Sequence, residues 1–213
     1  YKELWTDDIL LTALYKSLLI GVSSATISTV FGLLIAIAFV RFSVFKGRLI
    51  LSLVASAPLV MPEAVTGLSM LLLFIAMEIS FGWPSGRGVD TIMIAHATFG
   101  MCFAAVVIQT RLRDMDKYLE EAARDLGGRQ PFVFLSITLP LILPSIIAAW
   151  LLSFTLSFDD LVIASFVSGP GSSTLPIVIF SKIRLGVSPE INAIATLMIL
   201  TISVLVLFGS ILI

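Results

Sequence analysis

The sequence predicts an all-α protein that crosses a membrane several times, and three observations lead to that class. Apolar residues make up 58% of the 213 residues, charged residues make up only 13%, and the mean hydropathy is +1.10. Soluble domains contain about 45–50% apolar and about 25% charged residues. The chain also contains long stretches without a charged residue, and about 20 apolar residues suffice for a helix to cross about 30 Å of hydrocarbon.

Five stretches are expected to form transmembrane helices: residues 17–40, 49–77, 91–110, 130–158 and 191–213. Residues 161–181 also lack charge, but the Gly- and Pro-rich run 168–173 is typical of a turn, so we expect a loop or re-entrant segment there. The polar, acidic first eight residues do not resemble a signal peptide. We therefore expect the chain to begin in an interhelical loop, with a sixth helix before Tyr1.

The orientation follows from the positions of Lys and Arg. Eight of the thirteen lie in two loops, 41–48 and 111–129. Short loops rich in Lys and Arg stay on the cytoplasmic side of a membrane. The sequence therefore predicts that both loops are cytoplasmic and that the N-terminus faces the opposite side.

Three acidic residues fall at or within the predicted spans: Glu63, Asp159 and Asp160. A charged side chain at the bilayer centre costs about 2.5–3.5 kcal/mol on insertion scales, so such residues are functional candidates. Adjacent residues on a helix point about 100° apart, so we expect Asp159 and Asp160 to face one cavity only if the helix unwinds; otherwise one faces a transport path and one a neighbouring helix. The alternatives are an inert Glu63 at the membrane interface and an Asp159 that caps a helix.

The second predicted span is expected to be kinked or broken beside Glu63. Pro58 and Pro62 each lack a backbone donor, and Gly67 follows. Broken helices beside acidic residues commonly line transport cavities.

The polar segment 111–140 predicts a short amphipathic helix from Asp116 to Leu126, a break at Gly127-Gly128, and a new helix opening at Pro131. The apolar residues of the short helix recur at three- and four-residue spacing, which places them on one face: Leu119, Ala122, Ala123 and Leu126. Lys117, Glu120, Arg124 and Asp125 are expected to face elsewhere.

The same segment resembles the EAA coupling signature of permease subunits of ABC importers. The matching positions are Glu121-Ala122-Ala123, Gly127, Ile137 and Leu139-Pro140. The resemblance implies that this helix binds in a cleft of a cytoplasmic ATPase subunit, through five residues: Glu121, Ala122, Ala123, Leu126 and Gly127. The alternative is an ordinary solvated surface helix.

Longer segments resemble polyamine importer permeases: residues 57–63, 154–170 and 186–193. Residues 82–88 and Leu175-Pro176 favour the putrescine-type members over the spermidine-type ones. The resemblance implies one transmembrane domain over residues 1–213, with the type I ABC importer permease fold of six spans, in the bacterial cytoplasmic membrane. It also implies a second homologous permease, two cytoplasmic ATPase subunits and a periplasmic polyamine-binding protein. The alternatives are an importer permease for another small solute and a stand-alone secondary carrier.

A polyamine cargo accounts for the acidic residues. A diammonium ion needs carboxylates for its ends and apolar or aromatic surface for its methylene stem. Asp159, Asp160 and Glu63 are the candidate carboxylates, and Trp150 and Phe158 are candidate aromatic contacts on the substrate pathway. The alternative for the aromatic residues is ordinary packing.

Several function classes are excluded or disfavoured. The chain has no G-x-x-x-x-G-K-[ST] phosphate-binding loop, so we expect no enzyme activity and no cofactor, with ATP and Mg²⁺ bound by the partner ATPase. One Cys and one His cannot form a typical metal site, and the net charge of −1 disfavours nucleic-acid binding. His96 is expected to hydrogen-bond across to another helix. The alternative is a proton relay, which would need an acidic partner that the sequence does not identify.

Overall fold

The computed structural model describes residues 7–42, 44–116 and 118–185, together with scattered residues between 193 and 207. The helices in this part are α1 (Asp8–Arg41), α2 (Arg48–Val60), α3 (Glu63–Phe81), α4 (Val89–Asp114), α5 (Tyr118–Asp125), α6 (Gln130–Val133), the π-helix η2 (Phe134–Thr138), α7 (Leu139–Phe158), α8 (Val162–Val167) and α9 (Leu175–Leu185). These described segments contain no β-strand, which confirms the predicted all-α class.

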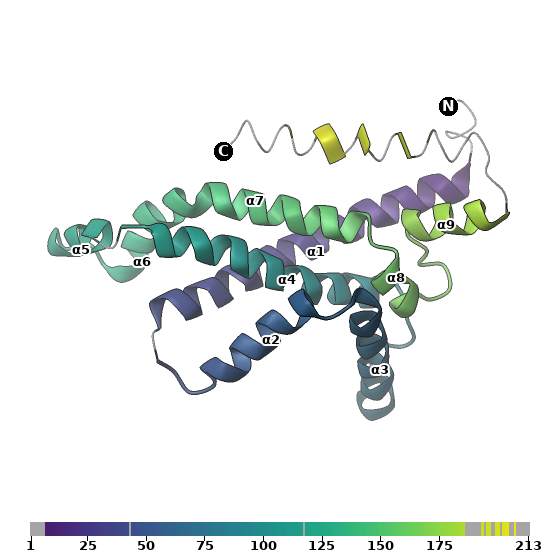
Figure 1. Ribbon diagram of the computed structural model, residues 1–213, viewed down its shortest axis with the longest axis horizontal. Coiled ribbons are helices and arrows are strands. Elements are labelled where there is room, and N and C mark those ends of the chain that lie inside the picture. Colours follow the sequence, from purple (N-terminus) through teal and green to yellow (C-terminus); the bar gives the residue numbers. More distant parts are fainter. Residues whose placement is uncertain are drawn as a thin grey trace.

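The centre of the molecule is a bundle of the three long helices α1, α4 and α7, which pack on one another along their length (Figure 1). Small residues allow the close approach, as is common between membrane helices. A Cβ atom at Gly32 of α1 would lie 2.7 Å from the Cβ of Ala104 in α4, and one at Gly100 of α4 would lie 2.6 Å from the Oγ of Ser28 in α1. At Gly32 the nearby atoms include the backbone N of Ala105, so no larger side chain fits there without a shift of the helices, whereas at Gly100 the Ser28 hydroxyl would be the first group to move.

Four helical stretches are long and apolar enough to cross a membrane: Asp8–Arg41, Glu63–Phe81, Val89–Asp114 and Gln130–Phe158. They confirm the spans predicted at 17–40, 91–110 and 130–158, although the first extends well beyond its predicted start. The predicted break in the second span is also confirmed, because α2 ends at Val60, Met61 is extended, and α3 begins after Pro62. The fifth predicted span, 191–213, lies mostly outside the described residues.

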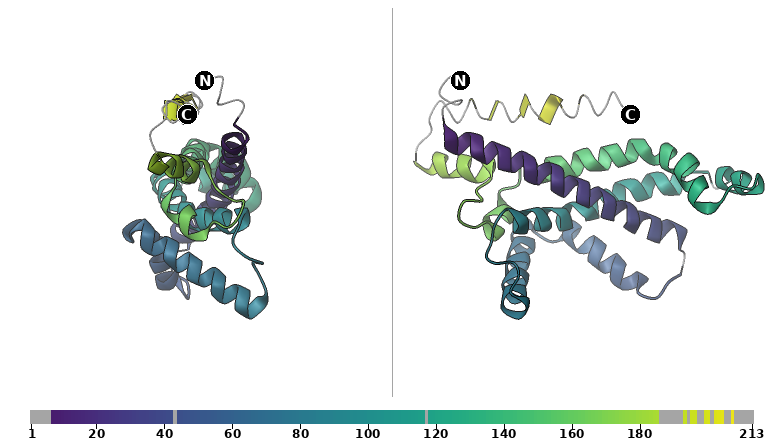
Figure 2. Two further views of the ribbon diagram at one scale, coloured as in Figure 1. Left: turned by 90° about the vertical axis from the view of Figure 1, so that its right-hand side faces the viewer. Right: turned by 180° about the vertical axis from the view of Figure 1, so that it is seen from behind.

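The two halves of the second span take different places in the fold. α2 lies beside α4, whereas α3 turns away from the bundle and packs on α8 (Figure 2). The close contact of α3 with α8 again depends on a glycine, since a Cβ at Gly67 would lie 2.7 Å from the ring of Phe166. The segment expected to be a loop or re-entrant is therefore a short helix, α8, followed by a turn and then α9.

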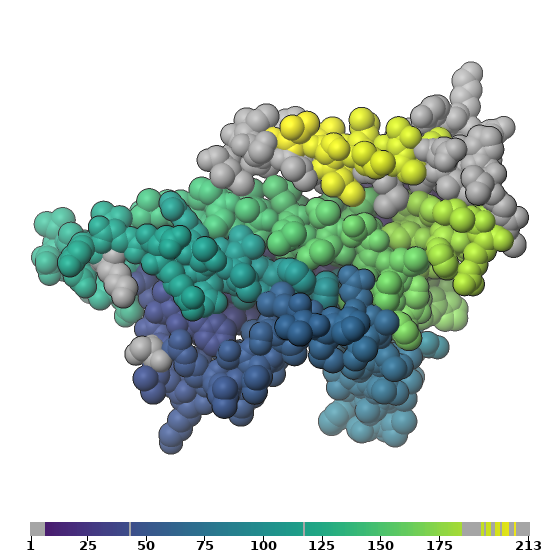
Figure 3. Space-filling model, in the orientation of Figure 1, coloured from purple at the N-terminus to yellow at the C-terminus, as the bar shows by residue number. Residues whose placement is uncertain are grey.

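The predicted cytoplasmic loops lie at one end of the elongated molecule. The end of α1, the start of α2, the end of α4 and the whole of α5 gather there (Figures 1 and 3). The opposite end holds α8, α9 and the start of α1, where the N–H of Leu175 donates to the Oγ of Ser17 at 2.7 Å. The fold therefore places the two loops rich in Lys and Arg on the same side of the molecule, as the sequence predicted.

Candidate functional site

The predicted coupling helix is present as α5, which begins at Tyr118 and ends at Asp125. The N–H of Tyr118 donates to the carboxylate of Asp116 at 2.9 Å, which satisfies one of the backbone donors that a helix start leaves free. The observed helix is shorter than the predicted one by one or two residues at each end.

The C-terminus of α5 is closed by the two glycines that the sequence indicated as a break. The N–H of Gly127 donates to the carbonyl of Arg124 at 2.8 Å, and the N–H of Gly128 donates to that of Ala123 at 3.0 Å. This pair of bonds is a Schellman motif. Gly127 has a φ of +84°, and a Cβ at Gly128 would lie 2.7 Å from the carbonyl oxygen of Ala123, so both positions require glycine.

The predicted contact residues of α5 are largely free of contacts within this chain. Leu126 is 90% exposed, Leu119 is 46% exposed, and both Glu121 and Ala122 are exposed, while Ala123 is half-buried. This apolar face is therefore open to a partner, as expected of a coupling helix.

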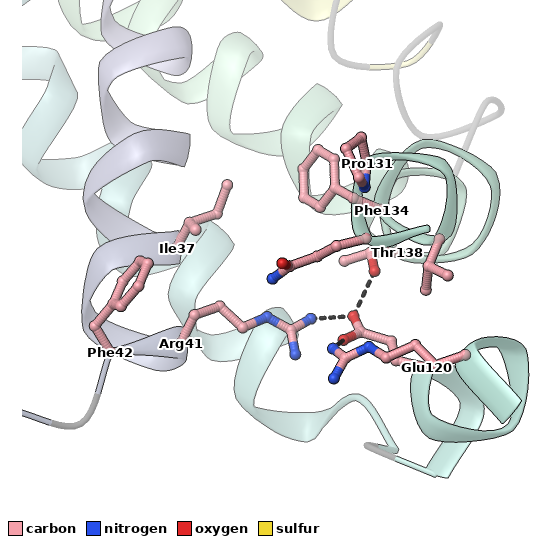
Figure 4. Close-up of a pocket in the computed structure, with 10 residues that line it drawn as sticks. Ile37, Arg41, Phe42, Glu120, Pro131, Phe134 and Thr138 are labelled. Atoms are coloured by element: carbon pink, nitrogen blue, oxygen red, sulfur yellow. Dashed lines mark hydrogen bonds and ion pairs between the residues drawn. The ribbon is translucent and has the colours of Figure 1, made fainter. Parts of the chain in front are cut away.

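The structure corrects the prediction for the side chain of Glu120. It was expected to face away from the contacts, yet it is buried, with only 5% exposed. Its carboxylate is bound by the guanidinium of Arg41, the last residue of α1, and by the hydroxyl of Thr138, the last residue of η2 (Figure 4). Arg124, one turn further along α5, lies 3.5 Å from the second carboxylate oxygen.

A cavity of about 350 Å³ lies beside this ion pair, between the end of α1 and the segment that leads into α7 (Figure 4). Its walls include both Arg41 and Glu120 together with apolar side chains: Ile37, Phe42, Pro131 and Phe134. A buried carboxylate is tolerated only when it is paired and hydrogen-bonded. The contacts of Glu120 meet that condition.

The second candidate site lies at the junction of α7 and α8, at the other end of the bundle. The helix stops at Phe158 and a new one begins at Val162, so Asp159 and Asp160 lie where the helix unwinds. The unwinding could let both face one cavity, yet the two side chains take different surroundings. Asp160 turns inward. Its carboxylate accepts the N–H of Ile163 at 3.3 Å and that of Ala164 at 2.7 Å, and so caps α8.

His96 of α4 is the further partner of Asp160. Its Nε2 lies 3.1 Å from the Oδ2 of Asp160, and its Nδ1 lies 2.7 Å from the Oγ of Ser157, which in turn hydrogen-bonds to Ser24 at 2.9 Å. His96 is only 4% exposed. The expectation of a hydrogen bond to another helix is confirmed, and the sequence had not indicated the acidic partner, because 64 residues separate the two.

Asp159 faces the other way and is exposed, as is Glu63 in the first turn of α3. The first turns of α3, which carry Glu63, pack on α8 just beyond Asp159 and Asp160, so the structure brings the three predicted acidic residues into one cluster. Within the described segments, neither Asp159 nor Glu63 forms a salt bridge. One residue of the Asp pair thus contacts a neighbouring helix and the other is available to a ligand.

The aromatic candidates form a stack along one side of α7. Trp150, Phe154 and Phe158 follow at four-residue spacing, with successive ring centroids 5.5 Å apart. Phe158 is 1% exposed and belongs to the core, and the Nε1 of Trp150 donates to the Oγ1 of Thr26 at 3.1 Å. The structure thus places Phe158 in packing contacts; a contact of Trp150 or Phe158 with substrate stays a prediction.

Comparison with known proteins places the chain in a family. Residues 28–213 match the family model described as "Binding-protein-dependent transport system inner membrane component". The chain belongs to this family and is a multi-span permease of the inner membrane.

Two relatives are close in sequence. A putrescine transport system permease protein of Escherichia coli (strain K12) is 53% identical over 199 residues, which cover 93% of this chain and 71% of that protein. A spermidine/putrescine transport system permease protein of Haemophilus influenzae is 40% identical over 93% of this chain and 75% of that protein.

Solved structures agree with the fold. The MetNI methionine ABC transporter in an inward-facing conformation superposes with a TM-score of 0.76 at 15% identity, over 95% of this chain and 94% of that one. An amino acid ABC transporter superposes with a TM-score of 0.65 at 22% identity, over 98% and 96%. At these identities the likeness concerns the fold alone, and it confirms the ABC importer permease architecture.

Proposed function

We propose that this chain is the permease subunit of an ATP-driven importer that carries a polyamine, with putrescine favoured, across the cytoplasmic membrane. The observation that carries the proposal is that two acidic residues, Asp159 and Glu63, are exposed, Asp159 in the break between α7 and α8 and Glu63 directly after the break between α2 and α3. The names of the two relatives, one a putrescine and one a spermidine/putrescine permease, point to the same cargo.

The chemistry of the acidic cluster suits a diammonium ion. Carboxylates form short, charge-assisted hydrogen bonds with ammonium groups. Asp159 and Glu63 have no salt-bridge partner among the described residues, so binding of an ammonium group would relieve the repulsion between two like charges. Asp160 already has three partners and contributes negative charge to the cluster while holding the break in place.

In this proposal another subunit hydrolyses ATP and so supplies the energy for transport. The partners are a second permease, two cytoplasmic ATPase subunits that bind ATP and Mg²⁺, and a periplasmic polyamine-binding protein. The open apolar face of α5 supports binding of an ATPase cleft at that helix. A movement of α5 by the ATPase would switch the cluster between the two sides of the membrane, as a two-state transporter requires.

The test is uptake of labelled putrescine, with spermidine as competitor, by cells that carry the complete transporter. Wild type is compared with Asp159→Asn and Glu63→Gln after the amount of assembled complex has been measured. The matched control is Glu78→Gln, because Glu78 is an exposed acidic residue on α3, roughly 22 Å along the helix from Glu63.

The proposal predicts that the two cluster variants lose uptake and that Glu78→Gln retains it. Normal uptake by both cluster variants would remove the acidic residues from the pathway. An absence of putrescine uptake by the wild type would show that another small solute is the cargo. Uptake without an ATPase partner would instead favour a stand-alone carrier.

A further inference from the structure

The coupling helix is attached to the membrane bundle by a buried charge. α5 packs against α6 and η2, both of which belong to the segment that leads directly into α7. Through Glu120 it also reaches Arg41 at the end of α1, 79 residues earlier in the sequence. Glu120 therefore connects α5 to two of the three helices that form the central bundle.

Apolar packing provides only part of the connection between α5 and the helix bundle. The cavity of about 350 Å³ separates the end of α1 from α6 and η2, and Arg41 and Glu120 both line it. Close-packed side chains transmit displacement because they leave no space to deform into. Beside this hollow, the charged hydrogen bond between Glu120 and Arg41 directly joins α5 to α1.

Arg41 is well placed to move α1 as a unit. It is the last residue of a 34-residue helix, where its positive charge also interacts favourably with the helix dipole. That helix packs along α4 and α7, and near its middle Ser24 hydrogen-bonds to Ser157 beside His96. A rigid α1 thus extends from the coupling helix to the neighbourhood of the acidic cluster.

We propose that Glu120 and Arg41 are positioning residues that transmit the movement of α5 to α1, so that ATP hydrolysis by the partner is converted into transport. The inference rests on the proposed function, because it needs an ATPase that moves α5. Thr138 holds the same carboxylate against η2, so α1 and α7 move together when α5 is displaced.

The experiment uses the complete transporter in proteoliposomes and measures ATP hydrolysis and putrescine uptake in the same preparation. Arg41→Gln removes the charge from a side chain that is 28% exposed, and it leaves Glu120 with Thr138 and Arg124 as partners. We expect the uptake per ATP hydrolysed to fall about tenfold, within the range of known coupling free energies. Glu120→Gln should give the same uncoupling, and Arg41→Lys should restore most of the ratio.

The matched control is Arg124→Gln. Arg124 contacts the same carboxylate from the same helix, but it is 50% exposed and more distant, at 3.5 Å. Its loss should leave the uptake per ATP within about twofold of wild type, as for most exposed ion pairs. The double variant Arg41→Glu with Glu120→Arg, which reverses the pair, should recover coupling relative to either single reversal.

A purely structural role would give a different pattern. Uptake and hydrolysis would then fall together, in proportion to the amount of assembled complex, and Arg41→Lys would bring back assembly without any change in the ratio. That result, or an unchanged ratio in Arg41→Gln, would overturn the inference. A wild-type complex that hydrolyses ATP but takes up no putrescine would instead contradict the proposed cargo.

Discussion

The imidazole of His96 in α4 lies 3.1 Å from the carboxylate of Asp160 at the start of α8, while Asp159, the adjacent residue, is exposed. The chain break between α7 and α8 separates the two aspartates in space and gives them different surroundings. Asp160 is held by a neighbouring helix and by two backbone N–H groups, and Asp159 is open to a ligand.

The first prediction separates stability from transport at this pair. Asp160→Ala leaves His96 and the first turn of α8 without their acceptor, so we expect a loss of about 1–3 kcal/mol in the free energy of unfolding. Asp159→Ala should change stability by no more than about 0.5 kcal/mol, because its side chain is exposed, yet it should reduce putrescine uptake. Thermal unfolding in detergent micelles together with uptake checks both. Equal destabilisation by the two variants would contradict the assignment.

The second prediction concerns the end of the coupling helix. Gly127→Ala places a Cβ in the left-handed region, which costs about 1–2 kcal/mol. Gly128→Ala pushes a Cβ against the carbonyl of Ala123 and so displaces the chain that follows α5. Both should lower the amount of ATPase that co-purifies with the permease.

Gly88→Ala is the control for these variants. Gly88 has an extended backbone, and a Cβ there would meet no atom within 4 Å. It should bind as much ATPase as the wild type. Equal binding by Gly127→Ala would show that the Schellman motif is not needed for the contact.

The membrane spans could be predicted because each depends on local properties of the sequence. A charge-free run or a proline acts within its own segment, so the spans near 17–40 and the break at Met61-Pro62 follow from a single stretch of chain. The end of α5 was predictable for the same reason, since Gly127 and Gly128 close the helix through hydrogen bonds to residues of that helix.

The contacts between distant segments could not be predicted in that way. In the sequence pattern Glu120 falls outside the apolar face of α5, like a solvated surface residue. Its burial depends on Arg41 and on Thr138 in other helices. The pairing of His96 with Asp160 likewise exists only once α4 packs beside the α7–α8 break. No local pattern indicated the pairing of Arg41, because a positive charge at the cytoplasmic end of a long apolar run is expected without any acidic partner.

The third prediction is a pH dependence at the end of the molecule opposite α5. The ammonium of Lys182 in α9 donates to Asp7 at 2.6 Å and holds the pKa of that carboxyl below its ordinary value. A lowered pKa in the folded state means that the ion pair stabilises the protein above the unfolded-state pKa, and that this contribution is lost as the pH falls through the folded-state pKa. Since both side chains are about one quarter exposed, the contribution should be below about 1 kcal/mol.

The measurement is the melting temperature of the purified protein between neutral and acidic pH. Asp7→Asn should flatten the acid side of the profile, and Lys182→Gln should do so only in part, because the N–H groups of Ile9 and Leu10 also donate to the Asp7 carboxylate and lower its pKa. The double variant should be no flatter than Asp7→Asn. Additive effects of the two substitutions would show that the residues act independently.

The fourth prediction tests the open apolar face of α5. Leu126 is 90% exposed and stands just after the last residue of the helix, so it has almost no packing contacts in this chain to lose. If an ATPase cleft buries it, Leu126→Asp places a charge in an apolar contact and should reduce ATPase binding about tenfold or more, while the thermal stability of the permease stays within about 0.5 kcal/mol. Val44→Asp is the matched control, because Val44 is also 90% exposed and lies in the other predicted cytoplasmic loop. The measurement is the affinity of the purified ATPase for each variant in detergent. Equal weakening by both substitutions would indicate a general effect of added negative charge at this end of the molecule. Unchanged affinity in Leu126→Asp would show that α5 is an ordinary solvated helix.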